Sequence, residues 1–287
     1  MLWLHQRPGA AMKCPAPGIH GDVPASVYHS WDCISQSQLK DVLDSPADYI
    51  HRSRHKRQQT DAMALGEAVH TLTLEPDNEG SIVICGTKTR RGKAFQELQD
   101  DNPGACIVTE SQMETAREMR DAIMADDTAR RMLDGDREVS LRWDAGLVNC
   151  KARLDVVRAR AIVDVKTGRD ISPQTFQRDA FRKWRYHMQA AWYREAAAQA
   201  IGGPVRDFYL VCVQSAPPHH VKVYSIGERA IAVGESLCKR ALKTYQDCAA
   251  AGKWPGYGGG IQLLEISDWT AEEHTRQADE EVSVNDF

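Results

Sequence analysis

The chain has 287 residues, of which 26% are charged and 42% hydrophobic, proportions that are ordinary for a folded globular protein. Its formal net charge of −4 excludes a surface that binds nucleic acid indiscriminately, so any contact with DNA must be confined to a local groove. No stretch approaches 18 apolar residues and the first residues lack a secretory apolar region, so we expect a cytoplasmic protein without a membrane span. Met12 is an alternative start to Met1.

The eight cysteines are spread through the chain without a Cys-x-x-Cys pair. The sequence therefore shows neither a zinc ribbon nor an iron–sulfur ligand set. A disulfide framework is not expected in a chain of this length without an export signal. Several cysteines lie in apolar runs, where a thiol behaves as a small core residue.

The first part of the chain predicts irregular structure followed by helices. Residues 1–33 are rich in proline, glycine and histidine and predict irregular structure. A serine-led segment over 35–43 predicts a short helix, and Ser45-Pro46 begins the next one. Apolar residues then recur at helical spacing over 62–74.

His70 lies on the helix predicted over 62–74, one turn after Gly66. A lone histidine on a mostly apolar helix is usually a hydrogen-bonded core residue. The functional alternative is a nitrogen ligand that completes a carboxylate site. The periodicity is compatible with both interpretations.

Two strands, over 81–85 and 105–108, are predicted around a polar insertion. The insertion contains the basic segment Thr89-Arg90-Arg91-Gly92-Lys93.

A helix is predicted over 110–125, and a shorter one ends near residue 135. Three apolar, β-branched runs follow and predict strands over 138–143, 147–157 and 161–166.

The last two of these strands predict a hairpin that turns at residues 159–160. In that register residue 158 faces 161, residue 157 faces 162, and the pairing continues outward in the same way. Asp155 then lies opposite Asp164, and Arg153 lies opposite Lys166.

Two facing carboxylates repel each other unless a positive charge lies between them. A hard divalent cation with oxygen ligands meets that need, and the neighbouring Lys166 could hold a water molecule or a phosphate oxygen. This layout is typical of a metal-dependent phosphodiesterase. The alternative is a surface hairpin that carries two solvated acids.

The remaining chain predicts helices over 173–181, 186–201 and 228–251, and strands over 207–214 and 220–226. The regions beyond residue 257 are rich in glycine and then acidic, which predicts a loose tail.

Polar residues lie along one side of the helix predicted over 186–201. Gln189 and Tyr193 lie one turn apart on it, and beside the hairpin Gln189 could bond a lysine, a metal-bound water or a phosphate. Arg182 and Arg185 precede this helix and form a basic stretch suited to a DNA backbone. Charge runs of this size are more often simply solvated.

Four separated motifs occur in an order that resembles RecB-type nucleases of the PD-(D/E)XK superfamily. They are Gly66-x-x-x-His70 with Leu74-Glu75, the strand of Asp155, Asp164-Val165-Lys166, and Gln189-x-x-x-Tyr193. Further segments, at 28–30, 34–39, 184–189 and 254–255, resemble the nuclease domain of RecE (exonuclease VIII). The resemblance covers residues 18–257.

The resemblance implies a metal site. Such nucleases use a histidine and two acids as ligands, which correspond here to His70, Asp155 and Asp164, joined by the carbonyl of Val165. The implied cofactor is Mg²⁺, with Mn²⁺ as a substitute.

The resemblance also implies catalytic roles. Lys166 would orient the attacking water and stabilise charge on the phosphoryl oxygens, alongside the acids Asp155 and Asp164. Gln189 and Tyr193 would position that lysine and the DNA strand.

Six basic residues are candidate DNA contacts by their charge: Arg90, Arg91, Lys93, Arg153, Arg182 and Arg185.

The activity implied by the resemblance is 5′→3′ digestion of linear double-stranded DNA. The products would be 5′-mononucleotides and 3′ single-strand overhangs for recombination, as in phage systems. The implied partners are further copies of the chain in a ring, a tetramer or trimer, and a single-strand annealing protein of the RecT type.

The fold that we expect is α/β, with a restriction-endonuclease-like core in which helices flank a central mixed sheet, and a helical N-terminal section. We expect an irregular extension over 1–17, one nuclease domain over 18–260 and an acidic tail over 261–287. Three alternatives remain open. These are a structure- or site-specific endonuclease on the same core, a non-catalytic DNA-binding subunit, and a phosphohydrolase of small nucleotides.

Overall fold

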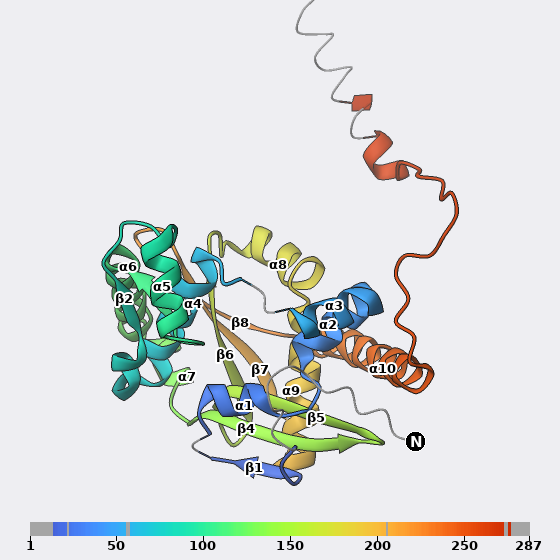
Figure 1. Cartoon of the computed structure of the whole chain (residues 1–287), viewed down its shortest axis with the longest axis horizontal. Helices are drawn as coiled ribbons and strands as arrows, with labels where there is room; N and C mark the ends of the chain where they lie inside the picture. Colours follow the sequence, from blue (N-terminus) through green and yellow to red (C-terminus); the bar gives the residue numbers. More distant parts are fainter. Residues whose placement is uncertain (1–13, 22, 56–57, 205, 273–274, 277–287) are drawn as a thin grey trace, which may run out of the picture. The chain divides into compact units, whose positions relative to one another are not determined.

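A mixed sheet of six strands forms the centre of the fold (Figure 1). The computed structural model describes residues 14–21, 23–55, 58–204, 206–272 and 275–276. The strands lie in the order β1 (Gly18–His20), β4 (Asp136–Ala145), β5 (Val148–Val157), β6 (Ala161–Gly168), β7 (Asp207–Gln214) and β8 (Val221–Ser225). Neighbouring strands are antiparallel except β6 and β7, which are parallel. The predicted α/β class with a mixed sheet is therefore confirmed.

Helices cover both faces of the sheet. They are α1 (Ala25–Ser30), α2 (Gln36–Asp44), α3 (Pro46–Arg54), α4 (Asp61–Leu74), α5 (Lys93–Asp101), α6 (Glu110–Ala125), α7 (Asp127–Met132), α8 (Pro173–Arg182), α9 (Tyr186–Ala200) and α10 (Glu228–Ala251), with a 3₁₀ helix at Pro76–Ser81. The predicted bounds of α6 and α10 are confirmed to the residue. Among the described residues, no helix is both long and apolar enough to cross a bilayer.

Side chains alternate along β6 between two hydrophobic cores. Ile162 belongs to the α9-side core, which also contains Trp192 of α9. Val163 and Val165 belong to the α4-side core, which also contains Val69 of α4. Because successive residues of a strand point to opposite faces, the two cores lie on opposite faces of the sheet.

The β5–β6 hairpin has the predicted turn and register. The N–H of Arg158 donates to the carbonyl of Ala161 at 2.8 Å, so residues 159–160 form the turn. The ladder then pairs Val156 with Val163 and Val157 with Ile162.

The expectation that Asp155 and Asp164 form the next pair of the hairpin ladder is wrong. The ladder ends at Val156, and Asp155 Oδ2 instead accepts the backbone N–H of Val165 at 2.8 Å. The strands separate there because the acid side chain occupies the position of a backbone acceptor. Arg153 and Lys166, one step further, are likewise not paired in this ladder.

Three further expectations need correction. Within residues 1–33, β1 pairs with β4, and α1 is helical. The polar insertion contains α5, which packs Phe95 against the small parallel sheet of β2 (Val83–Cys85) and β3 (Ile107–Thr109). Cys14 and Cys33 form a disulfide with a Cα–Cα distance of 6.2 Å, because β1 and the segment after α1 bring their backbones together.

The structure divides into two units, Met1–Trp254 and Pro255–Phe287. In the described part of the second unit, residues 268–272 are helical and six large hydrophobic side chains are exposed: Tyr257, Ile261, Leu263, Leu264, Ile266 and Trp269.

The packing of α9 against α10 depends on Gly234. A Cβ added at Gly234 would lie 2.1 Å from the backbone carbonyl oxygen of His187. We expect Gly234→Ala to destabilise the protein by at least ~2 kcal/mol, because this overlap outweighs the ~1 kcal/mol that alanine gains in a helix. Urea unfolding followed by circular dichroism measures the change. Gly80→Ala is the matched control, since no atom lies within 4 Å of the added Cβ, and an equal loss in the control would contradict the packing argument.

Candidate active site

A cavity of about 550 Å³ opens between the sheet, α2, α4 and α9. It is lined mainly by polar and charged side chains: Tyr28, His29, Ser35, Gln36, Ser37, Gln38, Lys40, His70, Glu138, Lys151, Ala152, Arg153, Asp155, Lys166, Tyr186, Gln189 and Tyr193.

A row of three carboxylates crosses β4, β5 and β6 at equivalent positions. Glu138 and Asp155 lie opposite each other on β4 and β5. The paired residues on either side of them are Arg137 with Val156 and Val139 with Leu154. Asp155 and Asp164 would occupy the step after the last β5–β6 pair. Ladder pairing is absent at both steps within the described strands, so three acids converge where the sheet is opened.

The backbone at Glu138 is in the left-handed region, with φ 53°. The alternation of side chains slips in β5 at the same place, because Leu154 and Val157 both face the α9-side core while Val156 faces the α4-side core. The β4–β5 register is the same on both sides of this step, so no residue is inserted there. One carboxylate oxygen of Glu138 and one of Asp155 lie within 4.8 Å of each other.

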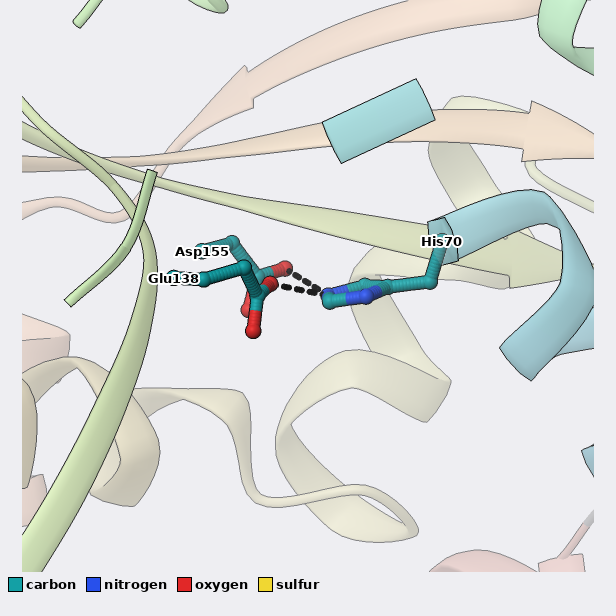
Figure 2. A group of neighbouring side chains, drawn as sticks. All are labelled: His70, Glu138 and Asp155. Carbon is teal, nitrogen blue, oxygen red and sulfur yellow. Dashed lines mark ion pairs between the residues drawn. The ribbon is translucent and has the colours of Figure 1, made fainter. Parts of the chain in front are cut away.

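His70 extends from α4 toward these acids (Figure 2). Its Nε2 lies 3.0 Å from Asp155 Oδ2 and 3.5 Å from Glu138 Oε1. α4 approaches β6 closely because Gly66 has no side chain, and a Cβ there would lie 3.0 Å from Thr167 Oγ1. Burial disfavours the imidazolium, but the carboxylates of Asp155 and Glu138 outweigh it and raise the pKa of His70 to about 9.

His70, Glu138 and Asp155 could hold a metal ion, since one ligand atom from each lies within 4.8 Å of the others. One imidazole and two carboxylates form a donor set that suits divalent cations. Glu138 Oε1 is buried and accepts no hydrogen bond from any residue that the structure describes. The donor set therefore fits the expected metal, and Glu138 Oε1, which accepts no hydrogen bond from the described residues, is available as a ligand.

Asp164 connects the acidic row to Lys166. Asp164 is 1% exposed; its Oδ1 accepts a hydrogen bond from Gln189 Nε2 at 2.7 Å, and its Oδ2 forms an ion pair with Lys166. Burial and the charge of Asp155 raise the pKa of Asp164 to about 6. Burial disfavours the charged lysine, yet Asp164 and the other neighbours raise the pKa of Lys166 above its ordinary value.

Two aromatic residues of α9 complete this part of the site. Lys166 Nζ lies 5.2 Å from the centre of the Tyr186 ring, a distance suited to a cation–π contact. Tyr193 lines the cavity one turn beyond Gln189, and its pKa is raised by burial. α9 is held against β5 by a hydrogen bond from Trp192 Nε1 to the Lys151 carbonyl at 3.0 Å.

Sequence reasoning missed Glu138. It placed this residue at the start of a strand without a role. The register of β4 against β5 could have identified it, because a turn at residues 146–147 sets Glu138 opposite Asp155. Its left-handed backbone has no signal in the sequence.

The candidate DNA contacts are scattered rather than gathered at the cavity. Arg153 lines the cavity but is ion-paired with Glu138 and donates to the Val23 carbonyl at 2.6 Å. Arg90 is buried, 3.2 Å from Asp61 Oδ1. Arg185 pairs with Asp44 at 2.8 Å. The remaining three, Arg91, Lys93 and Arg182, are exposed and do not line the cavity.

The predicted ligand role of Val165 concerns only its backbone carbonyl. Its side chain packs in the α4-side core and its N–H is bonded to Asp155. A ligand role for its carbonyl stays a prediction.

A mixed sheet flanked by helices, with acids and a lysine where two strands separate, defines a PD-(D/E)XK-type α/β protein. The chain belongs to the family described as "PDDEXK-like domain of unknown function (DUF3799)", which matches residues 35–266. A crystal structure of a "Putative exonuclease" from Eubacterium rectale has a similar fold, with a TM-score of 0.58 and 17% sequence identity. The similarity covers 88% of this chain and 99% of that one. No curated protein sequence matches the chain.

The donor set predicts that a divalent cation stabilises the folded protein. We expect Mn²⁺ to raise the melting temperature, because a ligand at 100 times its Kd adds about 2.7 kcal/mol to folding stability. Glu138→Gln should reduce that rise, since it removes a charged ligand atom. Each variant is compared with its own metal-free melting temperature by calorimetry.

The matched control for this measurement is Glu235→Gln, which changes an exposed acid on α10. An Mn²⁺-induced rise in Glu138→Gln equal to that of the control would contradict the assigned metal site.

Proposed function

We propose that this protein is a metal-dependent nuclease that digests linear double-stranded DNA from its 5′ ends. The observation that carries the proposal is the row of acids Glu138, Asp155 and Asp164. Lys166 is ion-paired with Asp164, and His70 contacts Asp155. Acids that converge on one buried point require a cation, and a lysine that is kept protonated next to them suits a phosphate.

The residues would divide the work between metal binding and phosphate binding. His70, Glu138 and Asp155 would hold the ion, with Asp164 at the edge of the same acidic row. A bound divalent cation polarises a phosphoryl oxygen and makes its water a better nucleophile at neutral pH. Burial of the site strengthens these electrostatic effects.

Lys166 would donate hydrogen bonds to the non-bridging oxygens of the scissile phosphate. Asp164 and the Tyr186 ring fix its ammonium group, so little reorganisation is needed when negative charge develops during the reaction. Gln189 would act through Asp164, because its amide bonds that carboxylate and thereby fixes the partner of the lysine.

The finer parts of the proposal are supported by similarity. The crystal structure with the related fold is that of a "Putative exonuclease", the four motifs resemble RecB-type nucleases, and further segments of the chain resemble the RecE nuclease domain. On that basis we include release of 5′-mononucleotides, a ring of identical subunits, and delivery of 3′ overhangs to an annealing protein. A ring would also reconcile the net charge of −4 with DNA binding, because only its channel need be basic.

The decisive experiment is digestion of linear duplex DNA labelled at either the 5′ or the 3′ end, together with a closed circle. We expect the 5′ label to be released early as a mononucleotide with Mg²⁺, while the circle stays intact and EDTA stops the reaction. A nicked or linearised circle would indicate an endonuclease instead. Absence of cleavage from every substrate would indicate a binding subunit and contradict the proposal.

Lys166→Ala should lower the cleavage rate by at least ~100-fold, since it removes a charged donor to the phosphoryl group. Metal binding should persist, because the lysine is not a ligand. Gel-based rates and the Mn²⁺ melting shift are measured on the same preparation. Lys239→Ala, on the outer face of α10, is the control. Retained activity in Lys166→Ala would contradict its catalytic role, and loss of the Mn²⁺ shift would contradict its exclusion from the metal site.

A further inference from the structure

The disulfide between Cys14 and Cys33 closes a loop that contains β1 and α1. The two cysteines are 19 residues apart in the sequence. The metal and lysine chemistry of the candidate active site does not use them. One wall of that site nevertheless lies inside the loop, because Tyr28 and His29 of α1 line the cavity. These two residues are called the α1 wall below.

α1 is a short helix that depends on contacts with the rest of the fold. It has six residues and no side-chain cap at its N-terminus, and an isolated helix of this length is not stable in water. Lys151 of β5 holds its far end, since Nζ donates to the carbonyls of Tyr28 at 2.9 Å and Trp31 at 3.0 Å. Tyr28, Trp31 and Cys33 form a small separate core, against which Cys14 packs. The disulfide is therefore a covalent part of the core that supports α1.

The chain before α1 is held by a short strand and by a loop contact. β1 pairs with β4 through three residues at the edge of the sheet. In the loop that follows, the carbonyl of Val23 accepts a hydrogen bond from Arg153 Nη1 at 2.6 Å. Cross-linking a loop of this kind removes conformational freedom from its open states and so stabilises the closed one.

Arg142 of β4 lies against the more accessible sulfur of the pair. Cys14 is partly exposed, whereas Cys33 is 3% exposed. Arg142 Nε donates to Cys14 Sγ at 3.2 Å, and Nη2 pairs with Asp144 at 2.8 Å. Arg142 Nη1 is buried and has no acceptor among the described residues. Because a guanidinium favours the charged form of an adjacent thiol, Arg142 is placed to stabilise a thiolate at Cys14 once the disulfide is opened.

We propose that Cys14 and Cys33 are a site of reversible thiol–disulfide exchange that controls the α1 wall of the cavity. The reductant would be a dithiol, and the oxidant a small disulfide. The closed disulfide holds α1 in place, and the opened one leaves it held by noncovalent contacts. The exchange itself is independent of the proposed function, whereas its effect on DNA cleavage rests on that function.

The exchange transfers two electrons from the dithiol to the protein. A thiolate of the dithiol attacks Cys14 Sγ, the S–S bond breaks, and the Cys33 sulfur leaves and takes up a proton. The second thiol gives its proton to solvent and attacks the reductant sulfur of the mixed disulfide, which releases Cys14 as a thiolate beside Arg142. The dithiol is thereby oxidised to a disulfide. A stabilised thiolate leaves faster, so Arg142 assists the second step.

The first measurement counts the thiols of the full chain. After treatment with glutathione disulfide we expect six free thiols, the number of unpaired cysteines, and after dithiothreitol all eight. Mass spectrometry of peptides locates the bond. Eight free thiols after oxidation, a bond between other cysteines, or a disulfide that resists dithiothreitol in the native protein overturns the proposal.

Hydrogen exchange measures the effect on the α1 wall. We expect the amides of α1 to exchange about tenfold faster or more in dithiothreitol than in the oxidised chain, because opening of the loop is no longer restrained. The amides of α6 should exchange equally in both. Cys14→Ser should show the fast exchange without dithiothreitol and no response to it. Cys248→Ala removes a free cysteine of α10 and is the control, which should respond as the wild type does. Equal exchange of α1 in both redox states overturns the proposal.

Arg142→Gln tests the stabilised thiolate. Alkylation of reduced Cys14 by iodoacetamide at neutral pH should be about three- to tenfold slower in this variant, because less of the thiol is ionised. Arg142→Lys keeps a positive charge and should retain most of the wild-type rate. A wild-type rate in Arg142→Gln contradicts the role assigned to the guanidinium.

Cleavage of linear duplex DNA with Mg²⁺ separates this proposal from the proposed function. The reduced chain should cleave about tenfold more slowly than the oxidised one, since a displaced wall misplaces the substrate. Equal rates in the two states overturn the control of the cavity. If α1 responds to the redox state but neither form cleaves DNA, the exchange site stands and the proposed nuclease function fails.

Discussion

Repulsion among three carboxylates, of which Asp155 and Asp164 are buried and Glu138 is partly buried, is the constraint on which the rest of the site depends. Glu138, Asp155 and Asp164 lie at equivalent steps of three adjacent strands, where like charges destabilise a sheet. Cationic side chains lie against each of the three acids and offset this repulsion, and Arg153 of β5 is ion-paired with Glu138. His70 of α4 contacts Asp155, and Lys166 contacts Asp164 on the same strand, β6. The same arrangement leaves room for a metal ion.

The sheet itself is altered to bring the acids together. The left-handed backbone at Glu138 and the slip in β5 interrupt hydrogen bonding that would otherwise continue across the three strands. Unusual backbone of this kind is costly and persists only where the surrounding packing enforces it. Here two cores on opposite faces of the sheet provide that packing, and Gly66 and Gly234 permit the close approach of α4 and α10.

The cavity is electrostatically divided. Its acidic part lies over β4 and β5, while Lys40 and Lys166 bring positive charge to the part beside α2 and α9. Metal-dependent cleavage of a phosphodiester requires both kinds of charge. Acids hold the metal ion, and cationic or N–H donors hold the phosphate oxygens. Under the proposed function, this division would let a chain with a net charge of −4 bind DNA at a local surface.

The sequence by itself determined the local elements and the acids of the hairpin. Helical periodicity and capping residues gave the bounds of α6 and α10, and the turn at 159–160 gave the register that brings Asp155 near Asp164. Only the tertiary structure decided which distant segments meet. Glu138 joins His70, Gln189 bonds Asp164, and Arg90 is buried against Asp61. Periodicity reports which face of an element is apolar, whereas these contacts depend on how whole elements pack, which no short segment encodes.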